Sequence, residues 1–143
     1  MKKVLITRPL PDVVVAEARK YFDVTMRSET SPLSMSEMQT ALGAFDGIMP
    51  TLGDMFQPNV FDSLSESKCS ILANFGVGYN HIDVDAALQR GVTVSNTPGA
   101  VTDATADIAM TLMLMSARRA GEGECGGGVA RAGAGAPHDC CHG

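Results

Sequence analysis

Short apolar segments alternate with turn-rich segments along the first 120 residues of the chain. Proline, glycine and charged residues bound these segments, as they commonly do at strand ends. Some apolar runs have the length of buried strands. They lie within residues 2–7, 22–26, 45–51, 69–76 and 92–96. The pattern therefore predicts five strands.

Helical patterns follow each of these runs. Ser34, with Glu37 three residues later, forms a capping-box pattern, and Asp12 and Asp83 are candidate N-cap residues. Apolar residues recur at helical spacing within residues 12–21, 34–42, 58–64, 83–90 and 102–119.

This alternation of strands and helices predicts an α/β fold. A strand that is followed by a helix and then by another strand favours parallel pairing, with helices packed against the sheet. With 143 residues the chain has room for about one domain. We therefore expect a flavodoxin-like sheet of five parallel strands with helices on both faces.

Composition and charge narrow the classes of partner. The chain is 45% hydrophobic, 19% charged and carries a net charge of −5, without a basic patch. These values are typical of a globular protein and disfavour nucleic acid or an anionic membrane as partners. No run approaches the ~18 apolar residues of a membrane helix, and Arg8 and Pro9 interrupt the first apolar run too early for a signal peptide. A cytoplasmic location is the expectation.

A Gly-x-Gly motif, Gly76-Val77-Gly78, follows the fourth predicted strand. A dinucleotide fingerprint would need a third glycine at position 81, where His81 stands, and a helix that starts closer to the motif. Backbone N–H groups at the carboxyl end of a parallel strand can instead hold an anion such as a carboxylate. A tight turn that merely needs glycine is the simpler alternative.

The segment "GVGYNHIDVDAALQRGVTVSNTPGAVTDATADIAMTLMLMSARR" carries a longer series of motifs. Gly-x-Gly, Ile-Asp, Arg-Gly-Val, Asn-Thr-Pro-Gly, Thr-Ala-Asp and Arg-Arg follow one another in it. This series resembles the D-isomer-specific 2-hydroxyacid dehydrogenases, particularly the glyoxylate and hydroxypyruvate reductases. The opening "VLITRPLPD" is similar to the same family, so the resemblance covers roughly residues 1–121.

The resemblance implies roles for five residues. The backbone of Val77 and Gly78 would bind the carboxylate of a small 2-oxo or 2-hydroxy acid, and the loop around Thr51 and Leu52 would line the substrate pocket. Thr105 would face the nicotinamide end of the cofactor. Taken alone, the Thr105 hydroxyl could equally satisfy a backbone donor at the start of a helix.

The resemblance also implies what lies elsewhere. Family members carry a catalytic Arg, Glu and His and a Gly-rich nucleotide loop in a second domain that follows the Arg-Arg pair. The Gly-x-Gly-x-x-Gly spacing of this chain, Gly121 to Gly126, stands in the last segment and follows a predicted helix rather than a strand, as a fingerprint would require. We therefore expect a substrate-binding domain over residues 1–100 and an interdomain helix over residues 101–120. The catalytic residues and the NAD or NADP site would belong to the full-length enzyme, commonly a homodimer. This chain alone is expected to be inactive and to bind no cofactor tightly.

The last segment, residues 121–143, is rich in Gly, Ala and Cys and does not follow the family pattern. Residues 128–131 can be encoded as GGA GTG GCG CGG, which reads Glu-Trp-Arg one base later, as the family would have it. We therefore interpret the segment as a disordered, out-of-frame tail. A metal site is the alternative, but adjacent cysteines suit one tetrahedral ion poorly and we assign no metal ligand. Its ligands would be Cys125, His138, Cys140, Cys141 and His142.

Two other classes of function stay open at this point. A stand-alone flavodoxin-like module for binding or signalling would have the same alternation of strands and helices. A phosphate-accepting receiver domain, however, would require an acidic cluster after the first and third strands, and the chain reads "TRPLP" and "MPTLG" there. A corepressor-like relative that uses the dehydrogenase fold without catalysis is the third alternative.

Overall fold

The structure is a computed structural model and describes residues 1–62, 64 and 66–119. It divides into two units, Met1–Ala100 and Val101–Gly143, and each is described by itself. The predictions for residues 121–143, an out-of-frame tail or a metal site at its cysteines and histidines, lie outside the described residues.

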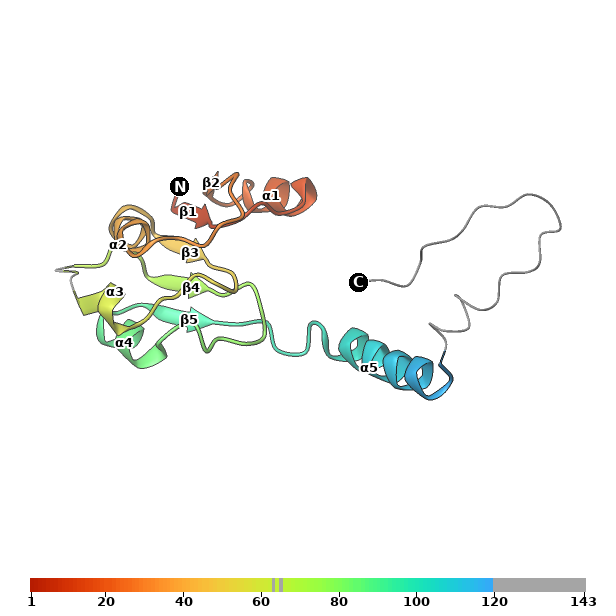
Figure 1. The fold of residues 1–143 in the computed structure, drawn as a ribbon. Helices are drawn as coiled ribbons and strands as arrows, with labels where there is room; N and C mark the ends of the chain where they lie inside the picture. Colours follow the sequence, from red (N-terminus) through yellow and green to blue (C-terminus); the bar gives the residue numbers. More distant parts are fainter. Residues whose placement is uncertain (63, 65, 120–143) are drawn as a thin grey trace, which may run out of the picture. The chain divides into compact units, whose positions relative to one another are not determined.

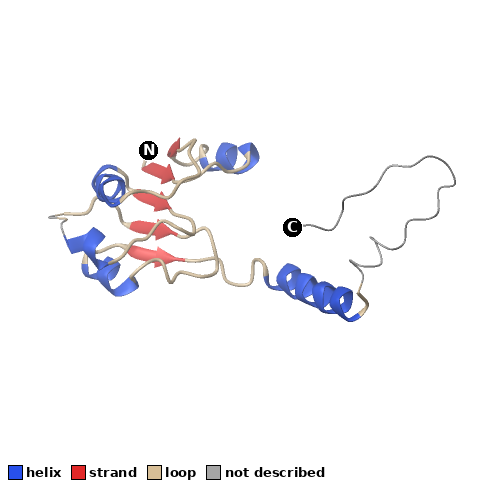
Figure 2. Ribbon diagram, in the orientation of Figure 1, coloured by secondary structure: helices blue, strands red, loops and turns tan. Residues whose placement is uncertain are grey.

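Unit Met1–Ala100 contains a five-stranded parallel sheet, and along the chain one helix connects each strand to the next (Figures 1 and 2). The order of the strands across the sheet is β2-β1-β3-β4-β5, and the predicted α/β fold class is confirmed. The strands are β1 (Lys3–Ile6), β2 (Asp23–Met26), β3 (Gly47–Met49), β4 (Ile71–Ala73) and β5 (Thr93–Ser95). The helices are α1 (Asp12–Ala18), α2 (Met35–Ala44), α3 (Pro58–Asp62) and α4 (Val84–Gln89).

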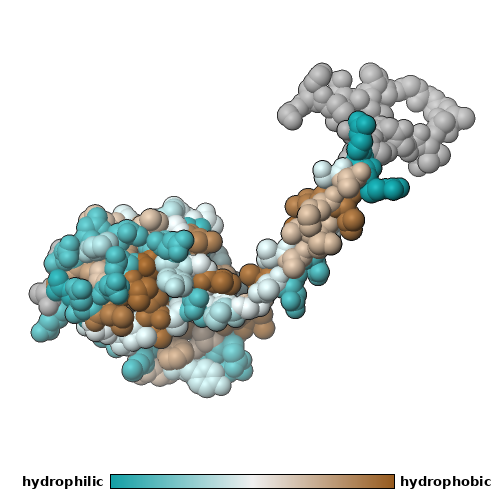
Figure 3. All heavy atoms as spheres, turned by 90° about the horizontal axis from the view of Figure 1, so that it is seen from below, coloured by the Kyte–Doolittle hydropathy of each residue, from teal (hydrophilic) through white to brown (hydrophobic). Residues whose placement is uncertain are grey.

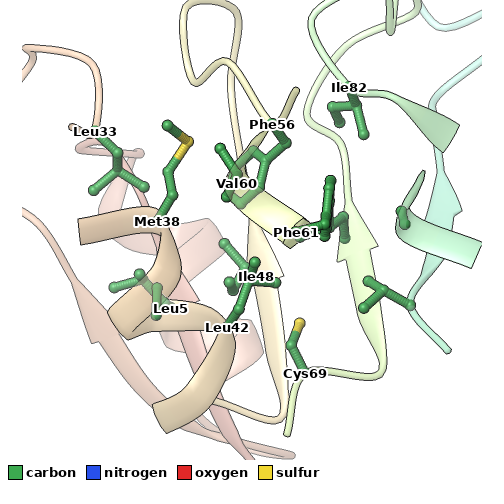
Figure 4. Packing of buried hydrophobic residues seen from close by; sticks show 14 residues of the cluster. Leu5, Leu33, Met38, Leu42, Ile48, Phe56, Val60, Phe61, Cys69 and Ile82 are labelled. Carbon is green, nitrogen blue, oxygen red and sulfur yellow. The ribbon is translucent and has the colours of Figure 1, made fainter. Parts of the chain in front are cut away.

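The main core lies between one face of the sheet and the helices α2, α3 and α4. Across the sheet, β2 lies on one side of β1, whereas β3, β4 and β5 follow on the other side. Since connections between parallel strands are right-handed, this reversal of direction places α1 on the face of the sheet opposite to α2, α3 and α4. Leu5, Ile48 and Leu72 are buried on their strands, and Leu42 and Phe61 from the helices belong to the same cluster (Figure 4). This cluster fixes the sheet and so fixes the loops that follow its strands.

The opposite face of the sheet is only partly covered. Val15 of α1 is buried there, and a groove of about 310 Å³ remains beside it. Val4, Ile6, Phe22 and Ile71 contribute to its lining, and Ile71 is 37% exposed. Within the described part of this unit, α1 is therefore the helix that packs against the second face of the sheet.

Local capping signals explain where α2 and α4 begin. The Ser34 hydroxyl accepts from the Glu37 N–H at 3.3 Å, and the Glu37 carboxylate accepts from the Ser34 N–H at 2.8 Å, so the predicted capping box is present. The Ser34 hydroxyl also donates to the Glu37 carboxylate at 2.6 Å, and this bond, followed by that from the Ser34 N–H, lowers the pKa of Glu37. The Asp83 carboxylate accepts from the Ala86 N–H at 2.8 Å, which confirms Asp83 as a cap.

The prediction for α1 was wrong in its details. Pro11, not Asp12, is the N-cap residue, and no side chain caps the helix. The ring of Pro11 fixes its φ, here −54°, close to the value that the first helical turn needs, so the helix begins without a polar cap. The helix also ends at Ala18 rather than Tyr21.

The second unit contains α5 (Thr102–Ala117), which begins where the sequence pattern predicts. Apolar side chains run along this helix (Figure 3). They include Ile108, Leu112 and Met115, the stripe expected from the sequence. Its assignment as an interdomain helix stays a prediction. Among the described residues, no helix combines the length and the apolar character that a membrane crossing requires.

Candidate functional site

The loops that follow four strands meet at the carboxyl edge of the sheet. Hydrogen bonds between backbone groups join them: Thr7 N–H donates to the Met49 carbonyl at 3.2 Å, and Phe75 N–H donates to the Pro50 carbonyl at 2.9 Å. The loop after β4 is tied to β5 in the same way. In open parallel sheets this edge is where ligands bind, so it is the place to look for a site. The predicted substrate residues of loops 51–52 and 77–78 lie here.

The carbonyl groups of the Gly76–Gly78 segment are held by two asparagine side chains. The Asn74 amide nitrogen donates to the Gly76 carbonyl at 3.1 Å and to the Gly78 carbonyl at 2.9 Å. The Asn96 amide nitrogen donates to the Val77 carbonyl at 2.9 Å. Asn74 is 2% exposed and its two bonds are partly buried, whereas the bond from Asn96 is exposed.

These bonds determine where the neighbouring N–H groups point. In a trans peptide the carbonyl of one residue and the N–H of the next point in opposite directions, and the described chain contains no cis peptide. The Val77 N–H therefore points away from Asn74, and the Gly78 N–H points away from Asn96. Neither N–H donates to a group in the described part of the chain, and both residues are exposed. Two adjacent free donors of this kind suit an anion.

Gly78 has space around it. A Cβ placed on this residue would meet no heavy atom within 4 Å, and its φ is not in the left-handed region. Neither packing nor backbone conformation within the described residues requires a glycine here. The open space instead leaves room for a ligand to approach the two N–H groups.

His81 supports the same loop from inside the protein. Its Nε2 lies 3.0 Å from the side-chain oxygen of Asn74, and the residue is 6% exposed. Burial lowers the pKa of His81, and the nearby Asp54 opposes this shift. The sequence predicted no catalytic role for His81, and it gave no hint of the contact with Asn74. An asparagine directly after a strand was the available signal, because such side chains often bond to neighbouring backbone groups.

A buried carboxylate organises the loop after β3. Asp54 is fully buried, and its oxygens accept from the Thr7 hydroxyl at 2.6 Å, the Leu33 N–H at 2.9 Å and the Thr51 N–H at 3.0 Å. A buried charge is tolerated when it is hydrogen-bonded in this way. Thr51 is thereby fixed, whereas the Leu52 side chain is 67% exposed at the edge.

Arg8 and Gly53 complete this loop. The Arg8 guanidinium donates to the Leu52 carbonyl at 2.9 Å. Gly53 has a φ of +105°, and a Cβ on it would lie 2.8 Å from the Arg8 guanidinium. Position 53 therefore favours glycine because of its backbone conformation, and a larger residue would also displace the end of the Arg8 side chain.

The Gly76–Gly78 loop does not fit a dinucleotide phosphate. The next helix, α4, begins only at Val84, and the Asp83 carboxylate already accepts from its first turn. A phosphate at the N-terminus of α4 would meet the Asp83 carboxylate, because that carboxylate already accepts from the Ala86 N–H. Thr105, the residue predicted to face the nicotinamide, lies in α5 of the other unit, where its N–H donates to the Val101 carbonyl at 2.9 Å. Its role stays a prediction.

A parallel sheet with the strand order β2-β1-β3-β4-β5 belongs to the doubly wound α/β class, in which ligands bind at the carboxyl edge of the sheet. Residues 4–135 match the family model of the D-isomer specific 2-hydroxyacid dehydrogenase, catalytic domain, and the chain belongs to this family. The match reaches residue 135, beyond Arg119, where the motifs quoted from the sequence end.

Curated relatives and solved structures agree with this membership. The chain is 43% identical over 124 residues to a glycerate dehydrogenase from Hyphomicrobium methylovorum, a match that covers 86% of this chain and 38% of that protein. It is 37% identical over 117 residues to a glyoxylate reductase from Thermococcus kodakarensis, covering 82% and 34%. The crystal structure of the TT0316 protein from Thermus thermophilus superposes with a TM-score of 0.73 at 31% identity, covering 94% and 43%. The chain thus spans well under half the length of these proteins.

Proposed function

We propose that this chain is the substrate-binding part of an NAD- or NADP-dependent dehydrogenase that reduces a small 2-oxo acid, of the glyoxylate or hydroxypyruvate class, to the D-2-hydroxy acid. The Val77 and Gly78 N–H groups bind the substrate carboxylate. The observation that carries this proposal is the pair of exposed, free N–H groups whose neighbouring carbonyls are tied back by Asn74 and Asn96. The names of the relatives, glycerate dehydrogenase and glyoxylate reductase, support the class of substrate.

In this proposal the loop after β3 forms the other side of the substrate pocket. Asp54 and Arg8 hold its backbone, so that Thr51 and Leu52 face a small acid. The exposed Leu52 side chain offers an apolar contact to the substituent on the substrate's second carbon. A fixed loop of this kind favours small substrates, because it leaves little freedom to accommodate a larger group.

The reduction needs a hydride donor, which the nicotinamide cofactor supplies when it is bound. The cofactor's nucleotide half requires a Gly-rich loop between a strand and a helix, whereas the Gly-x-Gly-x-x-Gly of Gly121 to Gly126 comes after helix α5 in the sequence. Thr105 is the one residue of this chain that we assign to the nicotinamide end. The 143 residues alone are therefore expected to bind neither cofactor tightly and to show no turnover. The intact enzyme is proposed to be a cytoplasmic homodimer.

Binding of glycolate to the purified 143-residue chain, measured by calorimetry, tests this proposal. Ethylene glycol, which has the same size but no carboxylate, is the control ligand. Gly78→Val should weaken glycolate binding about tenfold, equal to about 1.4 kcal/mol, because its side chain crowds the anion. Gly43→Ala, at another glycine with no heavy atom within 4 Å of its Cβ, should leave affinity unchanged. Equal affinity for both ligands would contradict the proposal.

A further inference from the structure

We propose that Asn74 and His81 are positioning residues for the carboxylate site. His81 orients the side-chain amide of Asn74, and Asn74 orients the peptide between Gly76 and Val77, whose N–H binds the substrate. This inference rests on the proposed function, because it explains how the donors of that site are aimed.

The amide of Asn74 is suited to this task by its two N–H protons. One is donated to the Gly76 carbonyl and the other to the Gly78 carbonyl, at 3.1 and 2.9 Å. No carboxylate could make these bonds, since an ionised Asp only accepts hydrogen bonds. Because Gly76 and Val77 share a trans peptide, fixing the first carbonyl also fixes the Val77 N–H in the direction of the substrate.

His81 determines which way this amide faces. The Asn74 nitrogen is committed to the two carbonyls, so its oxygen faces Nε2 of His81 at 3.0 Å. That nitrogen must therefore carry the proton, and the ring is the Nε2–H tautomer. The other tautomer would place two acceptors against each other. It would favour a flipped amide, with its oxygen directed at the Gly76 and Gly78 carbonyl oxygens.

The surroundings of His81 direct its bonding at Asn74. Its Nδ1 is buried and has no hydrogen-bond partner among the described residues, so the ring's side-chain hydrogen bond goes to Asn74. The Gln57 side chain donates to the His81 carbonyl at 3.3 Å and holds the backbone of the residue. Both members of the pair are more than nine-tenths buried, which excludes water as a competing partner for the bond.

Nuclear magnetic resonance on the isotopically labelled 143-residue chain tests the inference. Glycolate affinity is read from the amide signals of Val77 and Gly78. Asn74→Asp and His81→Leu should lower this affinity about tenfold, the size expected for losing the bond that aims a donor. His81→Gln should stay within about twofold of the wild type, because its side-chain N–H₂ can replace the Nε2–H donor.

Two controls separate positioning from charge and from folding. Asn80 is an exposed residue of this segment and makes no hydrogen bond to another described residue. Asn80→Asp adds the same negative charge and should change affinity far less than Asn74→Asp. The amide signals of β1 and β3 report whether each variant keeps its fold. Wild-type affinity in a folded Asn74→Asp or His81→Leu chain would overturn the inference.

A readout without ligand distinguishes this inference from the proposed function. The ring nitrogen signals of His81 should show the Nε2–H tautomer. The Asn74 side-chain protons should exchange slowly with solvent in the wild type and in His81→Gln, but rapidly in His81→Leu. An Nδ1–H tautomer would overturn the inference even if glycolate binds. A wild-type chain with the expected tautomer and no response to glycolate would instead overturn the proposed function, together with the substrate role of the pair.

Discussion

The side-chain oxygen of Asn74 lies 3.0 Å from Nε2 of His81, and both side chains are buried. His81, which precedes α4, contacts Asn74, and Asn74 in turn donates to the carbonyl groups of Gly76 and Gly78. Free backbone donors alone would not define a site, because an unrestrained glycine loop could turn its carbonyl groups outward just as easily. The buried pair restricts that freedom, and this is the basis on which we propose that the loop is preorganised for an anion.

His81 should make stability depend on pH. Its pKa in the folded protein is lowered below the ordinary value of 6.5, mainly by burial, so the unfolded chain binds the proton more readily. The free energy of unfolding should therefore be highest above pH 6.5 and fall as the pH drops through the folded-state pKa. Urea denaturation of wild type and His81→Gln between pH 8 and pH 5 measures this effect, and the variant should show a flatter dependence.

The carboxylates should contribute in a separate, more acidic range. Hydrogen bonds lower the pKa of Glu37 below 4.5 and of Asp46 below 3.8, so their stabilisation is lost only as the pH falls below those values. A loss of stability between pH 8 and pH 5 that His81→Gln leaves unchanged would contradict the assignment to His81.

Asp54→Asn should destabilise the chain by about 2–3 kcal/mol, because hydrogen bonds to a buried charged group are among the stronger ones. The Asn nitrogen would also face donors: the Thr7 hydroxyl and the Thr51 N–H at one oxygen position, or the Leu33 N–H at the other. The free energy of unfolding in urea measures the change. Asp23→Asn, at an exposed position on β2, is the matched control and should cost less than about 0.5 kcal/mol. Equal effects of the two substitutions would show that the buried carboxylate does not hold the loop.

Leu42→Ala should cost about 2–5 kcal/mol, since Leu42 is fully buried between α2 and the sheet and its truncation leaves a cavity. Leu88→Ala removes the same atoms from a side chain that is 55% exposed and should cost much less. Thermal or urea unfolding compares the two variants. A loss at Leu42 no larger than that at Leu88 would be incompatible with the packing described.

The Cys69 thiol should react slowly in the folded chain. Its side chain is 2% exposed, burial raises the pKa of the thiol, and the sulfur donates to the Ile71 carbonyl at 3.2 Å. Alkylation of the folded chain with iodoacetamide, followed by mass spectrometry of the peptide that contains Cys69, should show little modification until urea unfolds the protein. Rapid alkylation under native conditions would indicate that the core around this residue is open.

Much of the fold could be predicted because its signals are local. The Ser34–Glu37 capping box and the Asp83 cap each involve residues three apart, and strand-forming runs are continuous in the sequence. Asp12 misled the prediction because Pro11 starts the helix through its fixed φ rather than through a side-chain bond.

The supports of the candidate site could not be predicted in this way. Asp54 meets Thr7 and Leu33 from 47 and 21 residues away, and this meeting depends on the order of strands in the sheet. The contact between Asn74 and His81 spans only seven residues, yet it requires the loop between them to turn back on itself. The sequence marked Val77 and Gly78 by their glycine pattern. Asn74 carries only the weak signal of an asparagine directly after a strand, and His81 carries none.

The central claim is that the Val77 and Gly78 N–H groups bind a substrate carboxylate, and amide chemical shifts test it most directly. Glycolate should shift the ¹H–¹⁵N signals of Val77 and Gly78 in a saturable way, with smaller changes at Thr51 and Leu52 across the pocket. The same concentrations of ethylene glycol should shift neither pair. Saturable shifts that leave Val77 and Gly78 unaffected, or equal responses to the two ligands, would contradict the account.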